Sequence, residues 1–162
     1  LVISVTGVRV SELCAIAAID VSTDGSSIQV LGKGSRDRIV YVSDAGLRED
    51  FMARRNRRIN EEGERAPLLV NGRGARLQPQ TLRQRLHKLR VRNGMSRTIT
   101  PHMLRHTAAT LLIESGTDIR FVQRLLGHAS IATTEIYTQV NDRSLRRAVF
   151  QANTLQQILV DP

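Results

Sequence analysis

The sequence has few of the residues on which several classes of protein depend. It contains one cysteine, no tryptophan, two tyrosines and three phenylalanines among 162 residues. A single cysteine excludes an intrachain disulfide and a zinc site built from cysteines. Cys14 stands among the apolar residues Leu13 and Ala15, so we expect it to be a small buried side chain. The scarcity of aromatic residues argues against a protein that stacks single-stranded nucleic acid on aromatic side chains.

Long apolar runs are also missing. No stretch approaches the roughly 20 residues of a membrane span, and no signal peptide is visible. We therefore expect no membrane association and a cytoplasmic location. The sequence starts without methionine, inside the apolar run LVISV at 1–5, and we expect it to be part of a longer protein.

Acidic residues are outnumbered by basic ones. There are 24 lysines and arginines against 15 aspartates and glutamates, which gives a formal net charge of +9. Such a charge favours a polyanionic partner, and double-stranded DNA fits best once single strands and membranes are set aside. Only Lys33 and Lys88 are lysines, so nearly all of the charge is arginine. Genome composition and bidentate phosphate contacts both explain that bias.

Local patterns predict one domain of the α+β class, mostly helical with a small antiparallel β-sheet. Two β-rich segments flank the turn residues 32–35, which is the pattern of a hairpin. The segment LLV at 68–70 suits a further short strand. Helices are predicted over residues 8–18, 44–60, 81–92, 101–115, 118–126 and 130–138.

The predicted helix at 81–92 has an apolar stripe and a basic remainder. Leu82, Leu86 and Leu89 follow the i, i+4, i+7 spacing of a stripe that faces a core. The basic residues either form a solvated surface or face DNA, and the overall charge favours DNA. The candidate DNA contacts on this helix are Arg83, Lys88, Arg90 and Arg92.

The segment 101–137, PHMLRHTAATLLIESGTDIRFVQRLLGHASIATTEIY, contains the residues that suit phosphodiester chemistry. Such chemistry needs neutralisation of the non-bridging oxygens and proton exchange at the attacking and departing oxygens. His102 and Arg105 are three residues apart and share one face of a helix. His128 follows a glycine at a helix end. Tyr137, beside these basic groups, is a candidate nucleophile.

These motifs resemble the C-terminal signature of the tyrosine recombinases, also called phage integrases. The family pattern is H-x-x-R, then G-H, then a tyrosine about nine residues later. TGVRVSEL at 6–13 is similar to the motif of the family's first arginine, and LGKG at 31–34 to the hairpin turn of its lysine. The resemblance covers roughly residues 1–145. The matching positions are Arg9, Lys33, His102, Arg105, His128 and Tyr137.

The resemblance implies a role for each position. Tyr137 would attack the scissile phosphate to give a 3′-phosphotyrosyl intermediate and a free 5′-hydroxyl. Arg9 and Arg105 would clamp the non-bridging oxygens, and Lys33 would protonate the departing 5′ oxygen. His102 would assist proton transfer from the tyrosine hydroxyl and back, and His128 would donate a hydrogen bond to the phosphate.

The resemblance also implies an enzyme that needs no metal and no cofactor, and that acts as a homo-oligomer, a tetramer on DNA. Residues 1–162 would be the catalytic domain without the N-terminal helical domain of the family. Residues 142–162 would form a tail that either folds onto its own domain or docks on a neighbouring protomer, and the resemblance favours docking. The alternatives are a type IB topoisomerase, a non-catalytic DNA-binding module and a metal-dependent nuclease.

Three further residues have weaker patterns. Glu12 either braces Arg9 through an ion pair or is an exposed helix carboxylate. His106 forms H-x-x-x-H with His102, but the glutamate of the zinc protease pattern is missing, so a structural hydrogen-bonding role is preferred. Tyr41 lies in a β-like run and is interpreted as a sheet residue.

Overall fold

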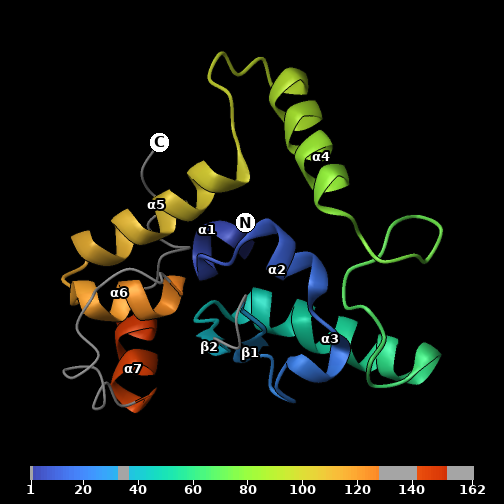
Figure 1. The fold of residues 1–162 in the computed structure, drawn as a ribbon, viewed down its shortest axis with the longest axis horizontal. Coiled ribbons are helices and arrows are strands. Elements are labelled where there is room, and N and C mark those ends of the chain that lie inside the picture. The colour runs from blue at the N-terminus through green and yellow to red at the C-terminus, as the bar shows by residue number, and fades with distance from the viewer. Residues whose placement is uncertain (1, 33–36, 128–141, 153–162) are drawn as a thin grey trace.

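The computed structural model describes residues 2–32, 37–127 and 142–152 (Figure 1). Helices predominate, and a short hairpin lies among them, as the sequence predicts. The elements in chain order are α1 (Val2–Thr6), α2 (Val10–Ala15), the 3-10 helix η1 (Ala18–Asp20), β1 (Ser27–Val30), β2 (Arg38–Tyr41), α3 (Ala45–Glu62), α4 (Pro79–Arg92), α5 (Pro101–Glu114), α6 (Ile119–Leu126) and α7 (Asp142–Ala152).

The predicted hairpin is confirmed. β1 and β2 pair antiparallel, with Ile28 opposite Val40 and Val30 opposite Arg38. Side chains alternate between the two faces of a strand, and Ile28 and Val40 are completely buried whereas Ile39 is exposed. Arg38 shares the parity of Val40, so the strand directs this arginine toward the interior.

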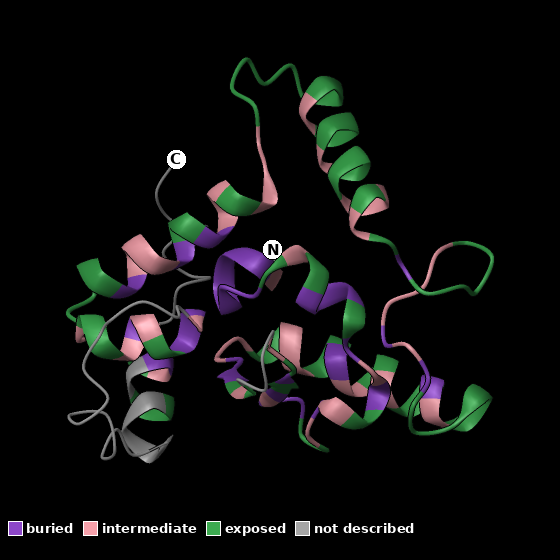
Figure 2. Cartoon of the chain, in the orientation of Figure 1, coloured by how far each residue is buried: buried purple, intermediate pink, exposed green. Residues whose placement is uncertain are grey.

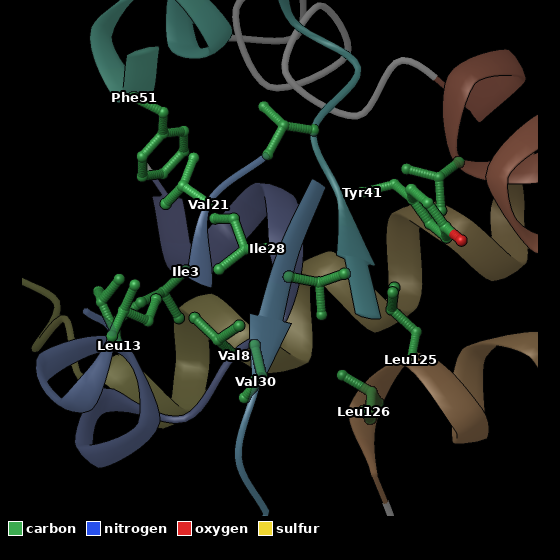
Figure 3. Packing of buried hydrophobic residues seen from close by; sticks show 14 of the residues in the cluster. Ile3, Val8, Leu13, Val21, Ile28, Val30, Tyr41, Phe51, Leu125 and Leu126 are labelled. Carbon is green, nitrogen blue, oxygen red and sulfur yellow. The ribbon is translucent and has the colours of Figure 1, made fainter. Parts of the chain in front are cut away.

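The core connects the hairpin with the helices that come before and long after it in the chain. In Figure 3 the buried cluster extends from Phe51 on α3 through Ile28 and Val8 to Leu125 and Leu126 on α6. α6 packs on β2 and on α5, and α5 also packs on α1. The last turn of α6 is therefore held by apolar contacts next to the turn between α1 and α2.

Gly7 makes the close approach of that turn to α6 possible. Its φ is +65°, and a Cβ at this position would lie 2.7 Å from Cδ2 of Leu126. A larger residue would be strained by the backbone conformation and would force the Leu126 side chain to shift. The TG dipeptide that ends the first apolar run is thus a packing requirement.

The helix predicted over 8–18 is shorter than expected. α2 ends at Ala15, because Ile16 turns to an extended conformation with ψ of 129° and its carbonyl accepts a hydrogen bond from the Leu68 amide. Cys14 is buried, as predicted. The charged helix predicted over 44–60 is α3, which begins after Asp44, whose side chain accepts from the Leu47 amide.

The strand expected at 68–70 is wrong. Pro67 and Val70 form only isolated bridges, with Ala17 and Arg76 respectively. The segment contributes apolar packing instead, since Leu68 is buried.

The core-facing stripe expected on the helix at 81–92 is confirmed only at Leu82, which packs against the core cluster. This helix, α4, has no buried residue, and Figure 2 shows it without buried positions along its length. Leu82 and Leu86 are only half-buried, and Leu89 is 54% exposed. α4 packs on α2 and otherwise stands away from the sheet (Figure 1). An amphipathic sequence pattern therefore does not by itself show that a helix packs against the core along its whole length.

The helices predicted over 101–115 and 118–126 are confirmed as α5 and α6. α7 packs on α5 and β2 of its own chain, with Val149 and Ala152 buried. The helix predicted over 130–138 lies outside the described residues. No helix in the described parts is long and apolar enough to cross a membrane.

Candidate active site

Arg105 is a buried cation at the centre of the candidate site. It lies on the first half of α5 and is 6% exposed. One Nη group donates to the Gly7 carbonyl and the other to the Leu126 carbonyl. The side chain therefore joins the turn between α1 and α2 to the end of α6.

The surroundings of Arg105 are electropositive. Burial, followed by the charges of Arg9 and Arg38, lowers the pKa of Arg105 to about 10, although Glu12 acts in the opposite direction. The group remains protonated at neutral pH. A bound anion would offset the desolvation cost of the charged Arg105 and its repulsion from Arg9 and Arg38. The electrostatics of the site therefore favour an anionic ligand.

Arg9 lies beside this buried group and reaches the surface. It precedes α2, and its side chain is 42% exposed. Nη1 donates to Oε1 of Glu12 at 2.7 Å, and Nη2 donates to the Gly127 carbonyl at 3.1 Å. Arg9 is thus held in place while part of its guanidinium group stays accessible from solvent.

Glu12 is buried and is shared by two arginines. Its carboxylate accepts from the side chain and backbone amide of Arg9 and, in two-pronged fashion, from Arg38. Burial alone would raise the pKa of Glu12, but the hydrogen bonds from Arg38 and Arg9 outweigh it and lower the pKa to about 2. The predicted brace for Arg9 is confirmed, and the alternative of an exposed carboxylate is wrong.

Arg38 is the residue of this cluster that the sequence analysis missed. Its side chain is 7% exposed, and its Nη2 lies 2.8 Å from Oε2 of Glu12. Its Nε donates to the Leu125 carbonyl at 2.6 Å. The available signal was strand alternation: an arginine two residues before the core residue Val40 points inward, where it requires a buried acid.

The last turn of α6 receives all three arginines. Arg38, Arg105 and Arg9 donate to the carbonyls of three consecutive residues. These carbonyls have no partner within the helix and carry the negative end of its dipole. Gly127 then leaves the helix in the left-handed conformation, with φ of +63°. The residues that accept these bonds are Leu125, Leu126 and Gly127.

The structure brings together only part of the predicted set. Arg9 and Arg105 meet at the end of α6, and His102 lies one turn before Arg105 on α5, exposed to solvent. The other three predicted residues lie outside the described residues. They are Lys33, His128 and Tyr137.

The flanks of two of those residues are described. Gly32, directly before Lys33, donates its backbone amide to Oδ1 of Asp37 at 3.3 Å, so the two ends of the hairpin turn lie close together. Gly127, directly before His128, is held by Arg9. The described neighbours of Lys33 and His128, Gly32 and Gly127, are therefore held at the hairpin and at the arginine cluster, respectively.

The remaining predicted side chains differ in their exposure to solvent. His106 is exposed, and Tyr41 is buried in β2 as predicted. On α4, three of the candidate DNA contacts are exposed and Arg90 is half-buried. A surface hollow on this helix is lined by Gln80, Arg83, Gln84, His87 and Lys88. The described residues contain no group of three histidine, cysteine or acidic side chains arranged to hold a metal ion.

The buried Glu12 carboxylate makes stability depend on acid pH. Its pKa falls from 4.5 to about 2 on folding, so its contribution is complete above about pH 4.5 and is lost as the pH falls toward 2. We expect the unfolding free energy of the wild type to exceed that of Glu12→Gln by about 3 kcal/mol at neutral pH. The difference should shrink between pH 4.5 and 2 in urea denaturation. Glu49→Gln, at an exposed position of α3, is the control, and a pH-independent difference would contradict the assignment.

Comparison with known proteins identifies similar sequences over almost the whole chain. The pattern of the phage integrase family matches residues 1–144. Tyrosine recombinase XerC of Myxococcus xanthus is 36% identical over 152 residues, covering 91% of this chain and 51% of XerC. Tyrosine recombinase XerD of Mycobacterium tuberculosis is 39% identical over 144 residues, covering 87% of this chain and 46% of XerD. The chain thus spans about half the length of the curated relatives it matches.

Solved structures give the same result. The crystal structure of XerA recombinase superposes with a TM-score of 0.70 at 38% identity, covering 93% of this chain and 55% of that one. The XerH site-specific recombinase bound to its difH substrate has a TM-score of 0.64 at 29% identity, covering 91% of this chain and 43% of XerH.

Proposed function

Since the chain belongs to the phage integrase family, we propose that it is the catalytic domain of a site-specific tyrosine recombinase. It cleaves and rejoins double-stranded DNA through a 3′-phosphotyrosyl intermediate. The observation that carries the proposal is the cluster at the end of α6. There, Arg9 and Arg38 share the Glu12 carboxylate, and Arg105 donates to the Leu126 carbonyl. The three guanidinium groups and the one carboxylate carry two excess positive charges, and the side chain of Arg9 is partly exposed.

The cluster suits one phosphodiester. Arg9 and Arg105 neutralise its non-bridging oxygens and stabilise the additional charge of the transition state. Both donate to carbonyl oxygens of the α6 end in the free protein, and a phosphate is a stronger acceptor than a carbonyl. The guanidinium groups are therefore placed before the DNA arrives.

The reaction proceeds by exchange of two phosphorus–oxygen bonds. The phenolic oxygen of Tyr137 bonds to phosphorus as the bond to the 5′ oxygen breaks, and no net hydrolysis occurs. His102 accepts the phenolic proton, and Lys33 gives a proton to the departing oxygen. His128 donates a hydrogen bond to the phosphate. The arginines supply the positive charge, so the proposed reaction requires no metal and no cofactor.

The protein acts in the cytoplasm as an oligomer on DNA, a tetramer for strand exchange. α7 packs on its own domain, so exchange of a tail between protomers involves the residues after Ala152. XerH, one of the similar structures, is bound to a DNA substrate, which supports DNA as the partner of this chain.

A nicked suicide duplex tests the proposal. The site is obtained by selecting randomised DNA for covalent capture by the protein. A protein–DNA adduct should accumulate because the short cleaved strand diffuses away, and a chelator should not reduce it. A noncovalent complex without any adduct would favour a DNA-binding module, and cleavage that depends on a divalent metal would favour a nuclease.

The basic face of α4 should contribute phosphate contacts. Replacing Arg83 and Lys88 together with glutamine should reduce the slope of log affinity against log salt by roughly 2, because each phosphate contact contributes about 0.9. Affinity for a short duplex is measured by fluorescence anisotropy at several salt concentrations. The control is Arg54→Gln with Arg57→Gln, two exposed arginines of α3. Equal slopes for the α4 variant and the wild type would show that α4 does not contact DNA.

A further inference from the structure

We propose that Arg38 is a positioning residue for DNA cleavage: it sets the orientation and free charge of Arg9 through Glu12. The inference rests on the proposed recombinase function. Arg38 is not one of the six residues of the predicted set, but its side chain joins Glu12 on α2 to the Leu125 carbonyl on α6.

The guanidinium group of Arg38 is fully engaged inside the protein. Nη1 and Nη2 donate to the two oxygens of Glu12 at 3.1 and 2.8 Å, and Nε donates to the Leu125 carbonyl at 2.6 Å. Only 7% of the side chain is exposed. Unlike Arg105, whose two Nη groups donate only to carbonyls, Arg38 is paired with a carboxylate that competes with a phosphate for it. Its effect on the reaction therefore passes through its partners.

Charge balance explains why Arg9 needs this partner. Among the residues that the structure describes, Glu12 is the one acid hydrogen-bonded to Arg9 and Arg38. With Arg38 present, the carboxylate is neutralised by a two-pronged contact, and Arg9 keeps most of its positive charge for the phosphate. Without Arg38, the same carboxylate pairs with Arg9 alone. Arg9 would then lose electrostatic attraction for the phosphate and would be drawn toward the carboxylate.

Packing explains the link to α6. A Cβ on Gly127 would lie 3.1 Å from Nη1 of Arg38 and 3.3 Å from its Cζ. The guanidinium group thus lies directly against the residue that precedes His128. Because Arg38 is also the first residue of β2, one side chain joins the hairpin that carries Lys33 to the helix end that leads to His128.

The test compares two substrates. One suicide duplex has the normal scissile phosphate and the other has a methylphosphonate there, which is uncharged and needs less neutralisation. We expect Arg38→Gln to slow adduct formation by about 10- to 100-fold on the phosphate, as for other buried partners that orient a reacting group. The loss should be several-fold smaller on the methylphosphonate, as for Arg9→Ala. The double variant Arg38→Gln with Arg9→Ala should be little slower than Arg9→Ala alone.

Arg58→Gln is the matched control. Arg58 is a buried arginine of α3 that binds Glu61, Glu62 and the Pro67 carbonyl, away from the site. Its loss should lower the thermal midpoint but leave the ratio of rates on the two substrates unchanged. If Arg38→Gln does not fold, Arg38→Lys keeps the charge without the two-pronged contact and is measured by the same ratio.

The outcomes separate the inference from the function on which it rests. A wild type that forms no adduct on the phosphate substrate would contradict the recombinase function itself. A wild-type adduct, together with an Arg38 variant that is equally slow on both substrates and additive with Arg9→Ala, would overturn the role of Arg38 alone.

Discussion

Replacing Tyr137 with phenylalanine should abolish the covalent protein–DNA adduct while leaving DNA affinity unchanged. The substitution removes one oxygen, which is the atom proposed to bond to phosphorus. The proposed mechanism assigns the attack to no other group of the set. The measurement is a denaturing gel of the suicide-duplex reaction, with affinity measured in parallel by anisotropy. We expect no adduct even after incubation many times longer than the wild type needs.

The second tyrosine provides the matched control. Tyr41 lies in β2 within the buried cluster (Figure 3), and Tyr41→Phe removes the same oxygen from a residue of the core. We expect this variant to lose some stability and to retain the adduct. An adduct that persists in Tyr137→Phe and disappears in Tyr41→Phe would place the nucleophile in the hairpin and reject the proposed mechanism.

Replacing Lys33 with alanine should slow cleavage of ordinary DNA by about 10²- to 10⁴-fold, the range for loss of a general acid. The defect should be largely absent when sulfur replaces the bridging 5′ oxygen of the scissile phosphate. A thiolate leaves without prior protonation, so the acid is no longer needed. Lys33→Arg should remain slow on ordinary DNA, because a guanidinium with a pKa above about 12 is a poor proton donor.

The only other lysine, Lys88, is the control that distinguishes proton donation by Lys33 from the loss of one positive charge. It lies on the exposed face of α4, and Lys88→Ala should weaken binding without responding to the sulfur substitution. Adduct formation is followed by rapid quench at saturating protein. A Lys33→Ala defect of the same size on both substrates would assign Lys33 to phosphate binding and leave the proton donor unidentified.

Much of the fold follows from local sequence signals. The β-rich arms around 32–35 and the charged segment before Gly63 form the expected hairpin and α3, because turn residues and capping residues act over short distances. The signals for α4 were less informative. Leucine spacing predicts an apolar stripe but not a partner for it, and Leu89 is exposed.

In the site, too, local sequence patterns predict some contacts and miss those that depend on packing. Arg9 and Arg105 are recognisable from motifs, and the pairing of Arg9 with Glu12 follows from the i, i+3 spacing on a helix. Arg38 is 26 residues from Glu12 and 87 residues from Leu125. Such contacts depend on how α2, β2 and α6 pack, which no local pattern contains. Strand parity indicates that Arg38 points inward but not which acid it meets.

The proposed recombinase mechanism requires that Tyr137 become joined to a 3′ phosphate. The most direct measurement is protease digestion of the trapped adduct formed in the presence of chelator, followed by mass spectrometry of the DNA-linked peptide. We expect a phosphotyrosine linkage at Tyr137 and a free 5′-hydroxyl on the released strand. A linkage at any other residue, a 5′-phosphate on the released strand, or the absence of an adduct until a divalent metal is added would contradict it.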